Sequence, residues 1–505
     1  MRDFDFEFNE SRSVGTTWIL DALWNRLGVG ETVRRVLADR HLDDSAERVL
    51  FALVANRALT PSAKLAARRV SEDVIISGLP ATSDDACYQA MDWLPEIKDA
   101  LETEVFERVT YTPDQELDLL VFDTASNSEI DQAQVAGVAV TRQGIPVRSW
   151  SWPDNTADST LIRQVWEDMG SSAPTRIVWV ANRGFTTADL RRDLREGGRN
   201  EYIVGAKLRS GSAEAGVVAA QSRADRYQEV ADLQVMEIQA GSGERYVLCH
   251  DPAAAERDAA VRARVLARLE GLIKDTDTIS SDMRAEKLRG FTVARHGRHR
   301  YLQITATGKF RVDMSAVEAE EKFDGKYLLR ASDTAMTAEE IALRYRQLLD
   351  VERSWRSMQQ AIDPRPGSQH IEGASRAHPV LCWLALLLAR VSENACHDSW
   401  PRLRQELDRI AVGTFTGPAG TFQLRTKITN AQLDILAKLA IDPPPRISQF
   451  TPAGGQVLML ALGFKPASGQ VNLAEPRCPL GGRVMGIRLQ GVVASLAPGL
   501  VKPRS

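Results

Sequence analysis

The sequence predicts a mixed α/β core that is interrupted by a β-rich insertion and flanked by helical N-terminal and C-terminal parts. Two observations support this fold class. Short apolar stretches between residues 116 and 204 are separated by polar turns and helical patterns, which is typical of a sheet with helices packed on it. In the regions before and after this core, apolar residues instead recur at helical spacing.

Length and composition agree with a folded protein of several domains. The chain has 505 residues, which suggests about three domains. It is 44% hydrophobic and 26% charged, a balance that excludes a disordered or fibrous chain. The 63 Lys and Arg residues nearly offset the 67 Asp and Glu residues, and the net charge is −4. Any nucleic-acid-binding surface would therefore have to be local.

Several features predict a soluble cytoplasmic protein with no membrane partner. The acidic, aromatic residues 1–10 do not form a signal peptide. The most apolar run, Val380–Ala389, is too short to cross a bilayer, so we expect a buried helix. The five cysteines show neither zinc-ligand spacing nor a disulfide framework, as expected in a reducing compartment. They are Cys87, Cys249, Cys382, Cys396 and Cys478.

Residues 1–112 are predicted to form a helical N-terminal domain. Ile19, Leu20, Leu23 and Leu27 recur at helical spacing, and residues 49–54 repeat the pattern. Thr60-Pro61-Ser62 would open a further helix, because proline is favoured at the first helical positions.

The core is predicted to begin at residue 113 with three strands, at 116–122, 135–140 and 145–150. The last two are joined by Arg142-Gln143-Gly144, a short connection typical of a hairpin. A helix at 155–170, a strand at 176–180, a helix at 187–196 and a strand at 201–204 follow. Three meandering strands followed by alternating helix and strand form a mixed sheet. This is the order of a ribonuclease-H-like core, to which we assign residues 113–206 and 333–395.

Residues 207–332 are predicted to form the β-rich insertion. It contains a charged helix at 256–273, strand-like pieces at 301–305 and 326–330, and Asp324-Gly325 as a turn between strands. Thr337 would then cap a long helix that runs to about Ile362. We expect a helical C-terminal part at 396–447, with its last helix at 430–439. The Gly- and Pro-rich tail, 448–505, is expected to be poorly ordered.

Three residues of the core could meet at one edge of the sheet. Asp123 ends the first strand, Asn182 ends the fourth, and Glu352 lies on the long helix after the insertion. Ligands bind where the strands of such sheets end. Two carboxylates on neighbouring strands and a third on a helix can hold two Mg²⁺ ions, which activate water or a 3′-hydroxyl and stabilise the leaving oxygen.

Several ordered motifs resemble the DDE insertion-sequence transposases, in the large branch with a β-rich insertion before the final Glu. They are FDTAS (122–126), PVRSW and WPDNTAD (146–158), WVANRGF (179–185), YRQLLDVERSWRSMQQ (345–360) and RAHPVLCWLALLLAR (376–390). The resemblance covers nearly all of residues 1–445. It implies DNA transposition: two-metal cleavage and strand transfer at the ends of an insertion element, with Mg²⁺ or Mn²⁺ as cofactor. It also implies double-stranded DNA of the terminal repeats as partner, and a homodimer on paired ends.

Carried over to this chain, the resemblance places Asp123, Asn182 and Glu352 at the catalytic positions, with Asp123 and Glu352 as metal ligands. The family has an aspartate where this chain has Asn182. Asparagine is neutral, so the site loses one negative charge and metal binding is weakened. Losing a metal ligand commonly lowers the rate by several orders of magnitude. We therefore expect an impaired catalyst; the alternative is a non-catalytic, domesticated or decaying DNA-binding protein.

Two further departures strengthen that expectation. In the family signature an Arg is common where Leu348 stands, and a Lys that is expected to contact the DNA ends stands at the position of Gln359. In addition, only residues 124–134 separate Asp123 from the next strand, whereas relatives carry a longer segment there.

Candidate DNA-binding residues lie on the core, in the insertion and along the Glu352 helix, where arginines could pair bidentately with phosphates. They are Arg183, Lys207, Arg298, Arg300, Tyr345, Arg353, Arg356, Arg376 and His378. The helical N-terminal domain is a further candidate for binding DNA ends. The run 295–301 contains two histidines but no nearby cysteine, which argues against zinc.

Structural interpretations remain open for the same residues. Asp123 could be a loop or cap residue, and Glu352 could be a solvated helix residue paired with Arg353 or Arg356. Asn182 could be a turn former. The basic residues could simply cover a solvated helix face or an exposed loop. Serine-hydrolase and nucleotide-binding sites are excluded, because no Ser-His-Asp arrangement and no Gly-rich phosphate loop is present.

Overall fold

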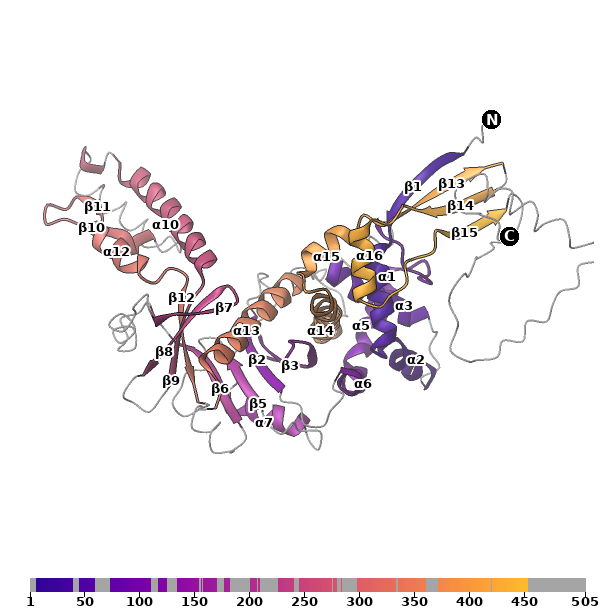
Figure 1. Cartoon of the computed structure of the whole chain (residues 1–505), viewed down its shortest axis with the longest axis horizontal. Coiled ribbons are helices and arrows are strands. Elements are labelled where there is room, and N and C mark those ends of the chain that lie inside the picture. The colour runs from indigo at the N-terminus through magenta and orange to yellow at the C-terminus, as the bar shows by residue number, and fades with distance from the viewer. Residues whose placement is uncertain are drawn as a thin grey trace, which may run out of the picture. The chain divides into compact units, whose positions relative to one another are not determined.

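The computed structural model describes residues 6–452 with gaps (Figure 1). The described ranges are 6–39, 45–59, 73–109, 117–124, 134–153, 156, 158–169, 177–181, 200–206, 208, 226–239, 245–274, 276–278, 283, 298–332, 335–359, 371–418 and 420–452. The chain divides into two units, Met1–Leu458 and Met459–Ser505. The predicted helix at 187–196 and all of the predicted tail after residue 452 lie outside the described residues.

The described residues of the N-terminal region are largely helical from Gly15 onward, as predicted, whereas the helix predicted to open at Thr60-Pro61-Ser62 lies outside the described residues. The helices of this region are α1 (Gly15–Arg26), α2 (Val29–Asp39), α3 (Ser45–Leu59), α5 (Asp84–Trp93), η1 (Leu94–Ile97) and α6 (Lys98–Val109). Apolar side chains at helical spacing form the interior; the rings of Trp24 and Phe51 meet edge to face, with centroids 5.5 Å apart. The indole of Trp24 donates to Glu47 over 2.6 Å, which satisfies a buried carboxylate.

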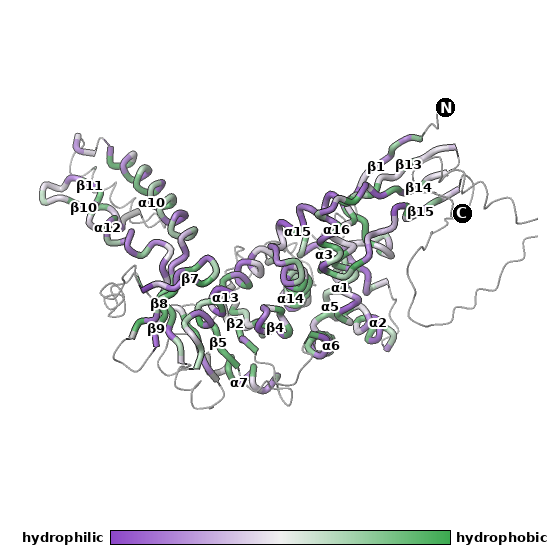
Figure 2. Tube along the Cα trace, in the orientation of Figure 1, coloured by the Kyte–Doolittle hydropathy of each residue, from purple (hydrophilic) through white to green (hydrophobic). Residues whose placement is uncertain are grey.

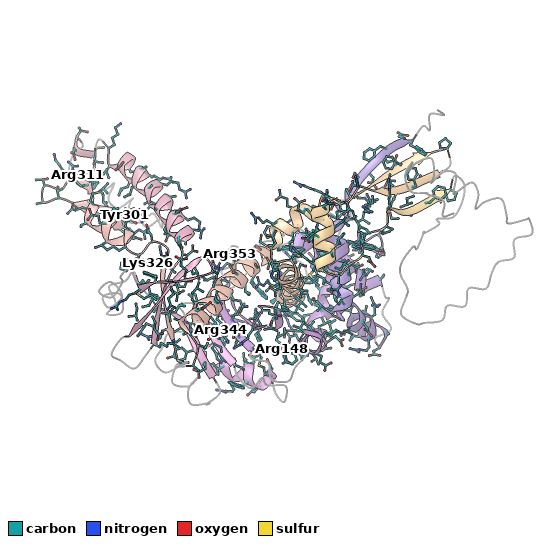
Figure 3. The ribbon with its side chains drawn as sticks, viewed as in Figure 1. Arg148, Tyr301, Arg311, Lys326, Arg344 and Arg353 are labelled. Atoms are coloured by element: carbon teal, nitrogen blue, oxygen red, sulfur yellow. The ribbon has the colours of Figure 1, made fainter. Side chains whose placement is uncertain are left out.

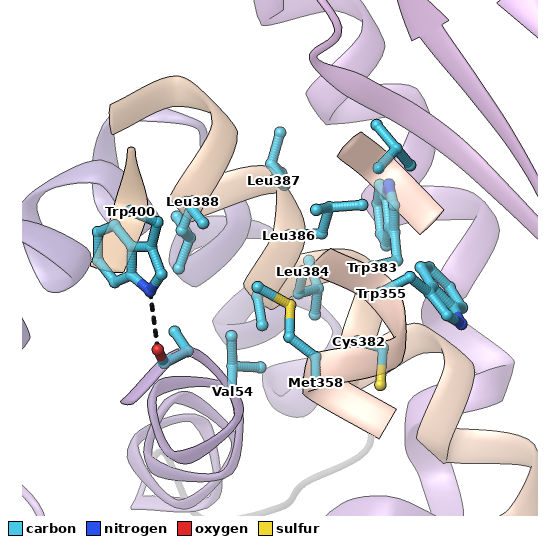
Figure 4. Packing of buried hydrophobic residues seen from close by; sticks show 14 of the residues in the cluster. Val54, Trp355, Met358, Cys382, Trp383, Leu384, Leu386, Leu387, Leu388 and Trp400 are labelled. Atoms are coloured by element: carbon cyan, nitrogen blue, oxygen red, sulfur yellow. Dashed lines mark hydrogen bonds between the residues drawn. The ribbon is translucent and has the colours of Figure 1, made fainter. Parts of the chain in front are cut away.

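Helix α14 (Ile371–Cys396) joins these helices to the rest of the protein. It packs against α3, α5 and β4, and Figure 4 shows part of its hydrophobic contact region. The indole of Trp400, at the start of α15 (Trp400–Leu407), donates to the carbonyl of Ala58 over 2.8 Å. The stretch Arg376–Cys396 is long and apolar enough to cross a membrane, but 67% of its apolar window is buried inside the protein. Most of the apolar surface of helix α14 is therefore buried in the core.

A nine-stranded mixed sheet forms the α/β core, which confirms the mixed α/β prediction. Its strands are β2 (Leu117–Thr124), β3 (Gln134–Thr141), β4 (Pro146–Pro153), β5 (Ile177–Ala181), β6 (Asn200–Ala206), β7 (Gln228–Val230), β8 (Leu233–Gln239), β9 (Arg245–His250) and β12 (Lys326–Ala331). Their spatial order is β4-β3-β2-β5-β6-β12-β9-β8-β7. Strands β2, β5 and β6 are parallel, whereas β4-β3-β2 form an antiparallel meander.

Alternating side chains of the central strands divide between the two faces of this sheet. Leu117 and Leu119 belong to a buried cluster that contains residues of α7 (Asp158–Met169). Leu120 belongs to the other buried cluster, with residues of α13 (Ala338–Gln359) and α14. Helix α13 begins with the predicted cap. Thr337 accepts from the backbone of Glu340, whose carboxylate accepts from the backbone of Thr337.

The insertion is continuous with the core sheet, because β7, β8, β9 and β12 extend it. Beyond these strands, α10 (Pro252–Ile273), α12 (Met314–Glu321) and the hairpin β10 (Leu302–Ile304)–β11 (Phe310–Val312) share a small buried cluster of their own. Helix α10 carries hydrophilic and hydrophobic residues along its length (Figure 2). The Asp324-Gly325 turn was predicted between two strands. It instead joins α12 to β12, and Gly325 adopts a φ of 62°.

A separate four-stranded sheet joins the two ends of unit Met1–Leu458, and no strand was predicted there. Its order is β1 (Glu7–Ser13), β13 (Ala411–Gly417), β14 (Gly420–Arg425) and β15 (Ile447–Pro452). Phe8, Phe415, Phe422 and Phe450 lie in register across the four strands. Strands therefore occupy part of the region 396–447 that was expected to be helical, alongside α15 and α16 (Asn430–Lys438), and β15 takes up the first residues of the expected tail.

Candidate active site and DNA-binding residues

One of the three predicted catalytic positions, Asp123, belongs to β2, whose parallel neighbour is β5. In the register of β2 and β5, Val121 lies beside Ala181. Asp123 is two residues beyond Val121 and lies opposite Val135 of β3. Asn182 directly follows Ala181, the last residue of β5. Strands β2 and β5 run in the same direction, so both end at the same edge of the sheet. The side chain of Asp123 and the whole of Asn182 lie outside the described residues.

The third position, Glu352, lies on α13, which packs against both β2 and β5. The face of α13 that contacts the core is apolar: Leu348, Val351 and Trp355 are buried. Glu352 itself is 5% exposed, and its carboxylate forms an ion pair with Arg356 one turn later. This pair is one of the two that the sequence suggested as the structural interpretation of Glu352.

A buried ion pair connects α13 to β2. Arg344 of α13 pairs with Asp118 of β2, and their side chains are 9% and 1% exposed. Figure 3 labels Arg344 on the same helix as Arg353. Two buried charges are costly to desolvate, so they are tolerated only when paired. The sequence contains one sign of this pair, because Asp118 interrupts the otherwise apolar run of β2.

Of the three predicted metal-site positions, the described residues include the side chain of Glu352 alone. The described residues contain no group of three or more His, Cys, Asp or Glu side chains placed to hold a metal ion. Glu352 is partly neutralised by Arg356, and the second acidic position of the family is the neutral amide of Asn182. A site for two divalent cations needs concentrated negative charge, and this chain supplies less of it than the family pattern requires.

Most of the described candidate DNA-binding arginines already pair with carboxylates. Arg353 contacts Asp350 over 3.0 Å, Arg356 pairs with Glu352, and Arg300 contacts Glu320 over 2.8 Å. Arg376 is exposed. The structure brings Arg353 and Arg356 together on α13, whereas Arg300 belongs to the insertion. Arg183, Lys207 and the side chain of Arg298 lie outside the described residues. For the arginines, phosphate contact stays a prediction.

The other two candidates lie in less accessible places. Tyr345 is 5% exposed and stacks on Tyr327, with ring centroids 5.5 Å apart. His378 is half-buried, and its Nε2 lies 3.7 Å from the Sγ of Cys382. Burial, together with the charge of Arg57, lowers the pKa of His378 to about 3. A neutral imidazole offers no positive charge to a phosphate, which argues against His378 as a phosphate contact.

Comparison with known proteins leaves the family open. No protein-family model matches the chain, and no similar protein was found among curated sequences. The resemblance to DDE transposases therefore rests on the sequence motifs alone.

Proposed function

We propose that this protein is a transposase-like DNA-binding protein of the DDE insertion-sequence class with an impaired active site. One observation carries the proposal: the strand order β4-β3-β2-β5-β6 with β2 parallel to β5 and α13 packed on both. This mixed α/β arrangement is compatible with the ribonuclease-H-like core that we propose. It supports a site in which Asp123, Asn182 and Glu352 occupy the three acidic positions.

The family reaction is cleavage and strand transfer at the ends of an insertion element, for which Mg²⁺ or Mn²⁺ supplies an activated oxygen nucleophile. In this chain Asp123 and Glu352 are the residues that would hold the metal. Because Asn182 lacks a charge and Glu352 is paired with Arg356, we propose weakened metal binding.

The proposed partner is double-stranded DNA with terminal repeats, bound by a homodimer on paired ends in the cytoplasm. We expect DNA binding to be stronger than residual cleavage, because phosphate contacts are spread over many side chains while the metal site has three positions.

The deciding experiment compares the natural chain with Asn182→Asp. Purified protein is mixed with labelled DNA that flanks its gene, in the presence of Mg²⁺ or Mn²⁺, and strand cleavage is measured. We expect little cleavage by the natural chain and an increase of at least on the order of tenfold for Asn182→Asp, since the third carboxylate restores metal binding. The matched control, Asn182→Asp with Asp123→Asn, should lose this gain.

Robust cleavage by the natural chain would overturn the impaired site. If Asn182→Asp gains nothing but DNA is still bound, the second candidate holds, a non-catalytic DNA-binding protein. The ion pair between Glu352 and Arg356 favours that candidate.

A further inference from the structure

Helix α10 of the insertion carries a buried, ion-paired arginine on one face and exposed arginines on the other. On the buried face Arg262 is 8% exposed and pairs with Asp324 over 2.6 Å and with Glu321 over 3.4 Å. On the opposite face Arg257, Arg264 and Arg268 are all exposed. We call these three residues the α10 arginine row. Arg262 holds the insertion together, whereas the row has no comparable task inside the described fold.

Helical geometry places the row along one line. At 100° per residue, the three arginines lie within about 40° of one another around the helix axis. The acidic residues of α10 lie about 100–140° away from Arg257 around the axis. They are Glu256, Asp258 and Glu270. No acidic residue of α10 itself therefore lies on the face that carries the row.

Few carboxylates among the described residues neutralise the arginines of the row. Arg257 lies 3.7 Å from Asp251 while its side chain remains 67% exposed. Arg264 donates only to the carbonyl of Ala260 in its own helix, over 3.4 Å, and no ion pair of Arg268 is found among the described residues. The neighbours on this face are exposed; Ala260, Ala267 and Gly271 are small, and Val261 is larger and apolar. A methyl group built onto Gly271 would touch nothing within 4 Å.

We propose that the α10 arginine row binds the phosphate backbone of double-stranded DNA. This inference rests on the proposed function, which it deepens by adding a contact surface in the insertion. The row spans about 16 Å along the helix, and duplex of that length carries about ten phosphate charges. Small residues between arginines allow the backbone to approach closely. Contacts of this kind position the protein without reading sequence.

The test measures how DNA affinity depends on salt. Fluorescence anisotropy of a labelled random-sequence duplex is followed for the full-length protein and for the triple variant Arg257→Gln/Arg264→Gln/Arg268→Gln. Glutamine keeps the helix propensity of arginine, so α10 should persist, which circular dichroism checks. Loss of three phosphate contacts should reduce the slope of log K against log salt by up to about 2.7 and weaken binding at low salt at least on the order of tenfold.

A matched control variant removes three positive charges from another part of the protein. Arg402, Arg409 and Lys438 each pair with a neighbouring carboxylate of their own helix or helix end. The triple variant with glutamine at these positions should bind DNA nearly as the natural chain does.

The possible outcomes distinguish failure of the arginine-row proposal from failure of the proposed function. If the natural chain binds DNA and the row variant matches the control, the row is not a DNA contact and the proposed function stands. If the natural chain binds no DNA even at low salt, the proposed function falls and the row with it. The exposed apolar side chains of Val261 and Leu272 border the row, and an acidic polypeptide is the alternative ligand that would contact both these side chains and the arginines. A row variant that binds DNA normally but fails to bind an acidic polypeptide would therefore also overturn the assignment.

Discussion

Helices α13 and α10 have the same length, 22 residues each, and both are rich in arginine, yet they use it differently. In α13, Arg344, Arg346, Arg353 and Arg356 are each paired with a carboxylate. In α10 only Arg262 is buried between acidic partners, while the row faces outward. The number of arginines therefore indicates little about DNA binding. The supply of acidic partners decides whether an arginine supports the fold or remains available to an anion.

The largest expected effect comes from breaking the buried pair of α13. Arg344→Met removes the guanidinium paired with Asp118 and leaves the carboxylate in an apolar setting, which should lower the free energy of unfolding by about 3–5 kcal/mol. Chemical denaturation measures it. The double variant Asp118→Leu/Arg344→Met should recover most of the loss, because no buried charge is left. A single variant as stable as the natural chain would show that the pair does not hold α13 on β2.

An intermediate effect is expected on the buried face of α10. Arg262→Met removes charged hydrogen bonding to Asp324, whose side chain is 12% exposed, and should cost about 1.5–3 kcal/mol. The loss should appear in the insertion as faster hydrogen exchange of α10 and α12 amides. Unchanged exchange there would mean that the small apolar cluster around Leu269 and Tyr301 holds the insertion together by itself.

The smallest effect on stability is expected in the α10 arginine row. Arg268→Met removes an exposed charge that has no ion pair among the described residues, so the free energy of unfolding should change by less than about 0.5 kcal/mol. The same denaturation experiment as for Arg262→Met provides the comparison within one helix. If Arg268→Met destabilised the protein as much as Arg262→Met, the two faces of α10 would not differ in the way proposed.

Prediction from sequence succeeded where short-range patterns dominate. The apolar runs of β2, β3 and β5, the Gly144 hairpin turn and the Thr337 cap all follow from residues within a few positions of one another. It failed where partners are distant. Strand β1 pairs with β13 about four hundred residues later, and the polar sequence of β1 has no strand pattern of its own. The turn at Gly325 was recognised, but the helix before it was not.

In the candidate site, too, some features follow from the sequence alone and others from the tertiary structure. The sequence alone determined which residues stand at the three positions, and it determined that Asn182 carries no charge, because side-chain chemistry is local. Only the tertiary structure decided that β2 and β5 are parallel neighbours beneath α13, that Glu352 pairs with Arg356, and that Asp118 meets Arg344 across 226 residues of chain. Such contacts depend on which elements share a core. Burial then decides which charges must find a partner and which stay exposed to solvent.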